Sequence, residues 1–141
     1  MKTGYTVSQV MRQDVLCAYP SDKIIDCARI MAEKERGSVI ICYEGKVLGI
    51  MTEQDLARKV MVRGVDPDRT PVEDVMSKNV QTISPENDIY DAMVLMGHEC
   101  IKHLPVTKGG RLVGIISYKD IIAIQPELIE LISFNCAIKR K

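Results

Sequence analysis

The chain contains a repeated order of apolar and polar segments. In its first half, a short apolar run at residues 15–18 ends in a Pro turn, and apolar residues then recur at helical spacing from Ile24. Two apolar runs follow at residues 38–42 and 47–51, separated by a Gly-containing turn typical of a tight hairpin. A second helix is predicted to begin at Thr52, so the pattern indicates the order β-α-β-β-α.

The second half of the chain repeats this order. Residues 7–56 align with residues 72–121 without a gap, and the identical pairs include Val10/Val75, Met11/Met76, Pro20/Pro85, Ile24/Ile89, Gly49/Gly114 and Asp55/Asp120. The same elements are therefore expected at residues 80–83, from Ile89, at residues 103–107 and 112–116, and from Ser117. Because only two copies occur, a pseudo-twofold pair is a better interpretation than a solenoid array.

The repeat predicts an α/β fold of the α+β kind, made of two β-α-β-β-α repeats. Its strands are mostly continuous apolar runs, so we expect the two repeats to pack face to face with pseudo-twofold symmetry. Ser21 and Ser84 are the predicted caps of the first helices. The predicted organisation is a first repeat at 5–62, a linker at 63–71, a second repeat at 72–125, and a C-terminal amphipathic helix with a basic tail at 126–141.

Composition narrows the possible classes of protein. The 141 residues are 46% hydrophobic and 27% charged, which is typical of a globular protein and not of a disordered one. The 19 basic and 19 acidic residues cancel, so no excess charge attracts nucleic acid or an acidic membrane surface. The sequence has no apolar run long enough to span a membrane and no secretory signal at its N-terminus, so we expect a cytoplasmic protein.

The five cysteines are odd in number, widely spaced and without a CxxC pair. A disulfide framework or a zinc site is therefore not expected. We interpret the cysteines as small apolar core residues in a reducing compartment. His98 and His103 have no second ligand at metal spacing, so no metal site is expected at either histidine.

A hydroxyl residue and an acid mark the start of each second helix. Thr52 precedes Asp55 by three residues, and Ser117 precedes Asp120 in the same way. This spacing is close to that of a capping box, which is the simpler, structural interpretation. The same groups also suit a ligand, because a helix N-terminus can bind phosphate and a carboxylate can accept hydrogen bonds from paired ribose hydroxyls. The two interpretations are compatible.

The best-matched stretches of the two halves resemble a known family. They are GSVIICYEGKVLGIMTEQDLARKV at residues 37–60 and CIKHLPVTKGGRLVGIISYKDII at residues 100–122. Together with Val-Met before each first strand, they resemble the tandem CBS-domain (cystathionine-β-synthase domain) proteins, or Bateman modules, over about residues 5–125. The resemblance implies a stand-alone module that forms a homodimer and binds an adenine-containing molecule between its repeats. AMP, ADP and ATP are expected first, with NAD and S-adenosylmethionine as alternatives.

The resemblance also implies a set of ligand-binding residues. They are Thr52, Asp55, Ser117 and Asp120 at the helix starts, Ala18 and Ile83 before the first turns, and Ser38, Lys102 and His103 where the second strands begin. A cation at the last position would neutralise phosphate. Only the second repeat provides Lys102 and His103 there, so we expect one stronger site and one weaker or empty site.

The expected function is that of a regulatory energy sensor, which signals to an unknown regulated protein through a change of dimer conformation. An enzyme is not expected, because the sequence has no Ser-His-Asp set, P-loop or metal cluster. The alternative is a non-catalytic structural or interaction protein with degenerate clefts. Such a protein would dock its partner, for example through the C-terminal helix.

Overall fold

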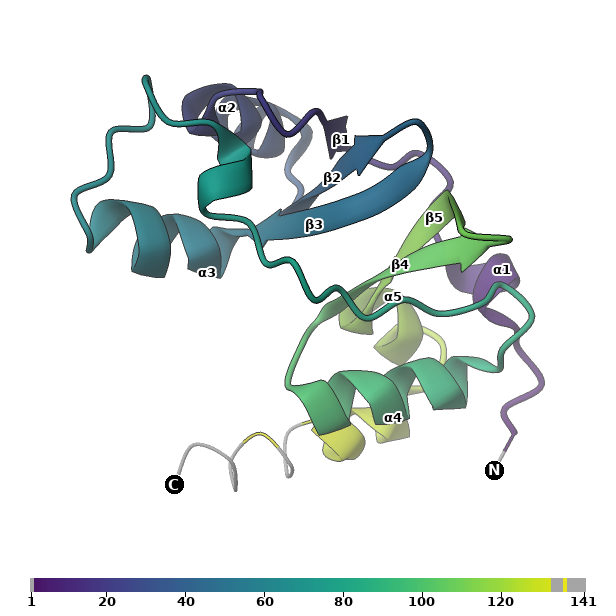
Figure 1. The fold of residues 1–141 in the computed structure, drawn as a ribbon. Coiled ribbons are helices and arrows are strands. Elements are labelled where there is room, and N and C mark those ends of the chain that lie inside the picture. The colour runs from purple at the N-terminus through teal and green to yellow at the C-terminus, as the bar shows by residue number, and fades with distance from the viewer. Residues whose placement is uncertain (1, 133–135, 137–141) are drawn as a thin grey trace. The chain divides into compact units, whose positions relative to one another are not determined.

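The computed structural model describes residues 2–132 and 136, and these form two compact units (Figure 1). The central unit consists of residues 15–80. The terminal unit consists of the described residues up to Asp14 together with those from Gln81 onward. The compact units therefore differ from the sequence repeats. Val10 and Met11 belong to the unit of the second repeat, and Val75 and Met76 belong to the unit of the first. The mixed α/β fold with two repeats is confirmed.

The central unit is built on a three-stranded sheet in the order β1-β2-β3. Its elements are β1 (Cys17–Ala18), α2 (Ile24–Lys34), β2 (Ser38–Tyr43), β3 (Lys46–Thr52), α3 (Glu53–Asp55) with its π-helical continuation Leu56–Met61, and a 3-10 turn at Val72–Asp74. β1 is parallel to β2, and β2 is antiparallel to β3. The hairpin closes through Glu44 and Gly45, which both have positive φ angles, so this turn suits the glycine in the sequence.

The terminal unit repeats this plan with a two-stranded sheet. Its elements are α1 (Val7–Val10), α4 (Ile89–Glu99), β4 (His103–Lys108), β5 (Arg111–Ser117), α5 (Tyr118–Ile122) and a 3-10 turn at Pro126–Leu128. β4 and β5 are antiparallel. The counterpart of β1 is a single parallel bridge between Ile83 and Val106, so the strand predicted at residues 80–83 is reduced to one pairing.

In each unit, the segment that precedes the other repeat lies against a glycine. We call residues 7–12 and 72–77 the exchanged segments. Ser77 pairs with Ile50 beside Gly49, and Arg12 pairs with Ile115 beside Gly114. A Cβ atom at Gly49 would collide with Met76 and approach the Ser77 carbonyl oxygen to 3.0 Å. The repeated glycine of the second hairpin strand therefore exists because another backbone passes directly over it.

Each unit has its own hydrophobic core. In the central unit, Ile24, Met31, Ile41 and Met51 are fully or almost fully buried between α2 and the sheet. In the terminal unit, the corresponding helix α4 packs Ile89, Met93 and Met96 into a core with Leu104 and Ile116. The first helices are capped differently from the prediction: α2 has Lys23 at its N-cap, and α4 has Asp88, which accepts a hydrogen bond from Tyr90 N at 2.8 Å.

The cysteines do not all lie in the core. Cys27 is buried, whereas Cys17 and Cys100 are exposed, so the interpretation of all five as core residues is wrong. Cys17 lies on the edge strand β1, and Cys100 ends α4 in the left-handed conformation. All five are free thiols.

The predicted C-terminal helix is described only in part. After the turn at Pro126–Leu128 the chain is helical over residues 129–132, and Leu128 and Ile132 are buried in the terminal unit. Residues 133–135 of the predicted helix and the basic tail at 139–141 lie outside the described residues. Within residues 2–132, no helix has the length and apolar character needed to cross a membrane.

Candidate functional site

The hydroxyl and the acid predicted in the central unit form a complete capping box. Thr52 Oγ1 accepts a hydrogen bond from Asp55 N at 3.3 Å, and Asp55 Oδ2 accepts one from Thr52 N at 2.9 Å. Asp55 is only 9% exposed, which makes it one of two buried polar residues in the described chain. The structural interpretation of this pair is therefore correct, and the geometry holds the carboxylate rigidly at the helix start.

The second oxygen of Asp55 faces a lysine. Lys59 Nζ lies 3.2 Å from Asp55 Oδ1, one helical turn further on. The same ammonium donates to the Val75 carbonyl oxygen at 3.3 Å and to Ser77 Oγ at 3.2 Å. Lys59 thus links the buried carboxylate to the exchanged segment that passes beside it.

The terminal unit has the same box with a different cation. Asp120 Oδ2 accepts hydrogen bonds from Ser117 N at 3.0 Å and Ser117 Oγ at 2.9 Å. Asp120 Oδ1 lies 3.6 Å from Arg12 Nε, on the exchanged segment of this unit. In both units the acid is therefore tied to the segment contributed from before the other repeat.

The start of each second strand lies directly opposite the hydroxyl residue. Ser38 is the strand partner of Thr52, and His103 is the strand partner of Ser117. Ser38 is buried, and His103 is half-buried. In each unit the structure thus brings together the predicted residue at the start of the second strand, the hydroxyl and the acid. The fourth predicted residue, before the first turn, lies elsewhere.

Lys102 adds a cation to the terminal site. Its ammonium lies 5.4 Å from the centre of the Tyr118 ring, which follows Ser117 directly. The Lys102 carbonyl oxygen also accepts a hydrogen bond from Tyr118 N at 3.0 Å. The residue at the equivalent position of the central unit is Gly37, whose carbonyl oxygen accepts from Glu53 N at 3.1 Å but which has no charge to offer.

The first-strand residues occupy the far side of the second strand. Ala18 pairs with Ile41 in the parallel register, and Ile83 donates from its N–H to the Pro105 carbonyl oxygen at 3.1 Å. Both residues pair with the middle of the second strand. They are therefore distant from the start of that strand, where Ser38 or His103 lies. The structure does not give either residue a contact with the hydroxyl and acid.

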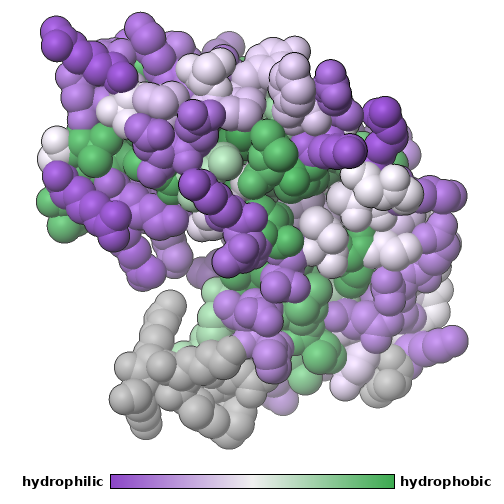
Figure 2. Space-filling view, in the orientation of Figure 1, coloured by the Kyte–Doolittle hydropathy of each residue, from purple (hydrophilic) through white to green (hydrophobic). Residues whose placement is uncertain are grey.

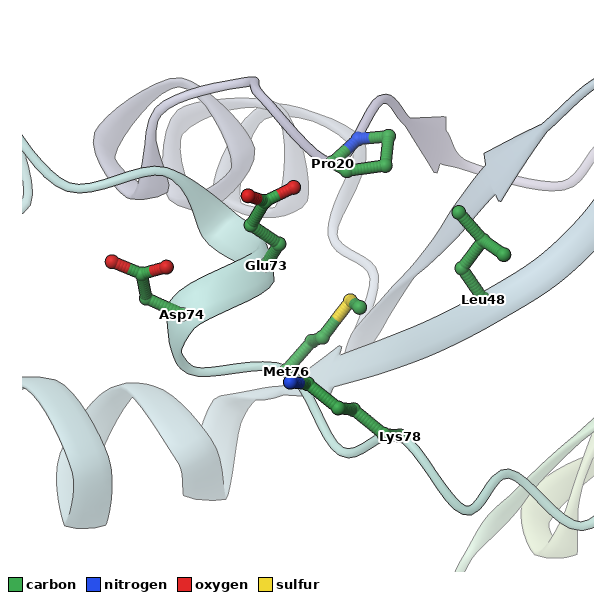
Figure 3. Close-up of a pocket in the computed structure, with 6 residues that line it drawn as sticks. All are labelled: Pro20, Leu48, Glu73, Asp74, Met76 and Lys78. Atoms are coloured by element: carbon green, nitrogen blue, oxygen red, sulfur yellow. The ribbon is translucent and has the colours of Figure 1, made fainter.

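A separate open cleft of about 730 Å³ lies in the central unit (Figure 3). It is lined by Pro20, Leu48, Glu73, Asp74, Met76 and Lys78, with Met76 lying between Glu73 and Leu48 in the view. Its volume is within the range of small-molecule sites. The sequence pattern indicated the turn at Pro20, but it did not predict that this turn or the other lining residues would form a cleft. The cleft is not lined by Thr52 or Asp55.

The described chain holds no cluster of three or more His, Cys, Asp or Glu side chains able to bind a metal ion. The side chains brought together at the two helix starts are a hydroxyl, a carboxylate and a cation. Such a set can hold polar hydroxyl or phosphate groups by hydrogen bonding.

The two halves of the sequence match one family. Residues 7–62 and 72–127 each match the CBS domain. This chain belongs to the CBS domain family. An uncharacterized protein of Methanopyrus kandleri is 35% identical over 129 residues, which cover 90% of this chain and 66% of the relative. This chain therefore spans slightly less than two thirds of that relative's length.

Solved structures of CBS proteins have the same fold. The hexameric CBS-CP12 protein from bloom-forming cyanobacteria is 29% identical, with a TM-score of 0.77 over 89% of this chain and 73% of that one. The CBS domain pair of protein MJ0100, solved in complex with 5′-methylthioadenosine and S-adenosyl-L-methionine, has a TM-score of 0.80. It is 24% identical and covers 87% of this chain and 97% of its own, a likeness that establishes the fold alone.

Proposed function

We propose that this CBS domain pair is a non-catalytic regulatory module that binds an adenine nucleotide or an adenosyl ligand. The observation that supports this most directly is the repeated pair of a hydroxyl and a carboxylate, held rigidly at the start of the helix in each unit. The candidate ligands are AMP, ADP, ATP, NAD and S-adenosylmethionine. A solved CBS pair of the same fold holds two adenosyl compounds, so this fold can accommodate that class.

The carboxylates keep acceptor capacity for a ribose. A carboxylate has about four lone-pair positions. Asp55 uses two at Oδ2, for the Thr52 amide and hydroxyl, and one at Oδ1, for Lys59. A ribose hydroxyl can therefore bind at the remaining position of Oδ1 or displace the ammonium. The backbone cap would stay intact in either case.

Displacement of the cation would give the module a way to signal. Lys59 connects Asp55 to the segment at Val75 and Ser77, and Arg12 connects Asp120 to the segment that contains α1. A ligand hydroxyl that takes the carboxylate would weaken this connection, so the exchanged segment would be held less firmly. The ligand can shift such an equilibrium only by its difference in affinity for the two states.

The terminal unit is the proposed site of tighter nucleotide binding. Lys102 lies beside Tyr118 and provides a cation near Ser117, and such a cation strengthens phosphate binding. The central unit has Gly37 and Ser38 at these positions, and its open cleft has Glu73 and Asp74 in its lining. The two carboxylates outnumber Lys78, the one cation of that lining, so the cleft disfavours phosphate and suits an adenosyl ligand without phosphate groups.

The proposed assembly is a homodimer that acts on a further protein. Met61 and Val62, at the end of the helix that continues α3, are 80% and 79% exposed, more than the other large apolar side chains of the described residues. Figure 2 shows other hydrophobic residues reaching a surface that is mostly hydrophilic. A CBS relative is hexameric, so members of this family do assemble with copies of themselves.

The test is ligand binding by nucleotide-stripped protein, measured by calorimetry and by thermal unfolding. A ligand present at about a hundred times its Kd raises the free energy of unfolding by about 2.7 kcal/mol, which corresponds to a shift of several degrees in Tm. Asp120→Asn should weaken nucleotide binding at least tenfold while keeping a side chain that can cap the helix. Asp88→Asn is the matched control, because Asp88 also caps a helix of the terminal unit but lies outside the site.

The outcomes separate the proposed functions. Loss of binding in Asp120→Asn but not in Asp88→Asn would support the sensor. Absence of any shift with all five ligands would contradict it and favour the alternative, an interaction protein with degenerate clefts. Turnover of a bound nucleotide, abolished in Asp55→Asn or Asp120→Asn, would contradict the non-catalytic assignment.

A further inference from the structure

Two cysteines of the central unit lie side by side on neighbouring strands. Cys17 Sγ on β1 and Cys42 Sγ on β2 are 3.8 Å apart. Cys17 pairs with Ile40 in the parallel register, so Cys42, two residues beyond Ile40, projects from the same face of the sheet as Ile40. Cys17 is exposed and Cys42 half-buried, so reagents in solution can reach the pair.

The two sulfurs have different proton affinities. The Cys42 thiol donates a hydrogen bond to the Cys17 sulfur, which lowers the pKa of Cys17 to about 7 despite partial burial. The same contact raises the pKa of Cys42 well above its ordinary value. A thiolate is the attacking species in disulfide exchange, and it is most effective when its pKa is near the ambient pH. Cys17 is therefore suited to attack first, and Cys42 to follow.

We propose that Cys17 and Cys42 form a reversible dithiol–disulfide modification site. The oxidant is a low-molecular-weight disulfide. The Cys17 thiolate attacks one sulfur of that disulfide, a mixed disulfide forms, and one small thiolate leaves. Cys42 then loses its proton to solvent or to the departing thiolate and attacks Cys17 Sγ, which expels the second small thiol. In total, two protein thiols are oxidised and one small disulfide is reduced to two thiols.

The geometry favours closure of the bond within one chain. The sulfurs must approach from 3.8 Å to about 2.05 Å. Residues offset by two on neighbouring strands lie about 7–8 Å apart, close to the upper limit for a disulfide. Closure therefore needs a small shift of the two-residue strand β1 as well as rotation of the two side chains. The other thiol of this unit is a contrast, because Cys27 is buried in α2 and desolvation raises its pKa to about 11.

A closed bond would join β1 to β2 covalently. β1 has only two residues, and Ala18 follows Cys17 directly. Oxidation would therefore fix the edge strand of the central sheet. This inference does not rest on the proposed function, because it concerns a covalent change that occurs with or without an adenine ligand.

The test treats the full chain with oxidised glutathione and reads the product by intact mass and by peptide mapping. The expected product is a monomer that has lost two hydrogen atoms, with the peptides of Cys17 and Cys42 linked, and dithiothreitol should reverse it. In Cys42→Ser the mixed disulfide on Cys17 should persist, because no second thiol resolves it. Cys100→Ser is the control and should form the Cys17–Cys42 bond as the unmodified chain does.

Three results would overturn the proposal. They are separate glutathione adducts on Cys17 and Cys42 in the unmodified chain, a link between two chains, and no reaction at either cysteine. The peptide map of the unmodified chain decides between these and the expected product even if Cys42→Ser fails to fold.

Discussion

Arg12 forms an ion pair with Asp120, a residue far from it in the sequence, with Arg12 Nε 3.6 Å from Asp120 Oδ1. In the other repeat, the residue equivalent to Arg12 is Ser77, and the carboxylate of Asp55 reaches it through Lys59. The position equivalent to Lys59 is Ile124, which has no charge. Each acid thus has one cation beside it. Lys59 comes from the same helix as its acid, whereas Arg12 comes from the exchanged segment.

Removal of these cations should have unequal effects on stability. Lys59→Met should lower the free energy of unfolding by about 1–3 kcal/mol, because it leaves a largely buried carboxylate without its charge partner. Arg12→Met should cost about 0–1 kcal/mol, since the Arg12 side chain is 57% exposed and water screens the pair. Chemical denaturation of both variants measures the difference. An Arg12→Met variant that loses as much stability as Lys59→Met would show that burial does not decide the strength of these pairs.

The glycine beneath each exchanged segment should be intolerant of a side chain. Gly49→Ala places a methyl group against Met76 and within 3.0 Å of the Ser77 carbonyl oxygen. The segment must move, at a cost of about 1–3 kcal/mol in the free energy of unfolding. Urea denaturation should show that Met76→Ala in the same chain recovers part of the loss. If Gly49→Ala alone is as stable as the unmodified protein, the close packing of this segment is not essential to the fold.

The sequence predicted the elements well because its apolar periods are regular and occur twice. Ser38 and Thr52 lie opposite each other because the start of one hairpin strand must face the end of the other. The sequence could not predict that Arg12 would approach Asp120, because that contact depends on which unit the first fourteen residues join. The cap of α4 was missed for a local reason: Asp88, not Ser84, is the residue directly before the first helical turn.

The reactivity of Cys17 should depend on pH near neutrality. Its pKa of about 7 means that the rate of alkylation by iodoacetamide rises about tenfold per pH unit below that value and levels off above it. In Cys42→Ala the donated thiol hydrogen bond is lost, so the pKa of Cys17 should rise and the midpoint of its profile should move to higher pH. Mass spectrometry of the Cys17 peptide measures both profiles, and Cys27, with a pKa raised to about 11, should react negligibly at pH 7. Identical profiles for the two chains would mean that Cys42 does not set the Cys17 pKa.

The charge of the central cleft should select among adenine ligands. Glu73→Gln with Asp74→Asn removes two carboxylates from its lining, so affinity for ATP should rise about three- to tenfold at low salt, while affinity for S-adenosylmethionine, which carries a positive sulfonium, should not rise. The measurement is calorimetry in a chain that also contains Asp120→Asn, so that the terminal site contributes little. Glu33→Gln with Glu35→Gln removes the same charge from an exposed part of this unit and should leave both affinities unchanged. An equal gain in that control would mean that the net charge of the unit, and not the lining of the cleft, determines the preference.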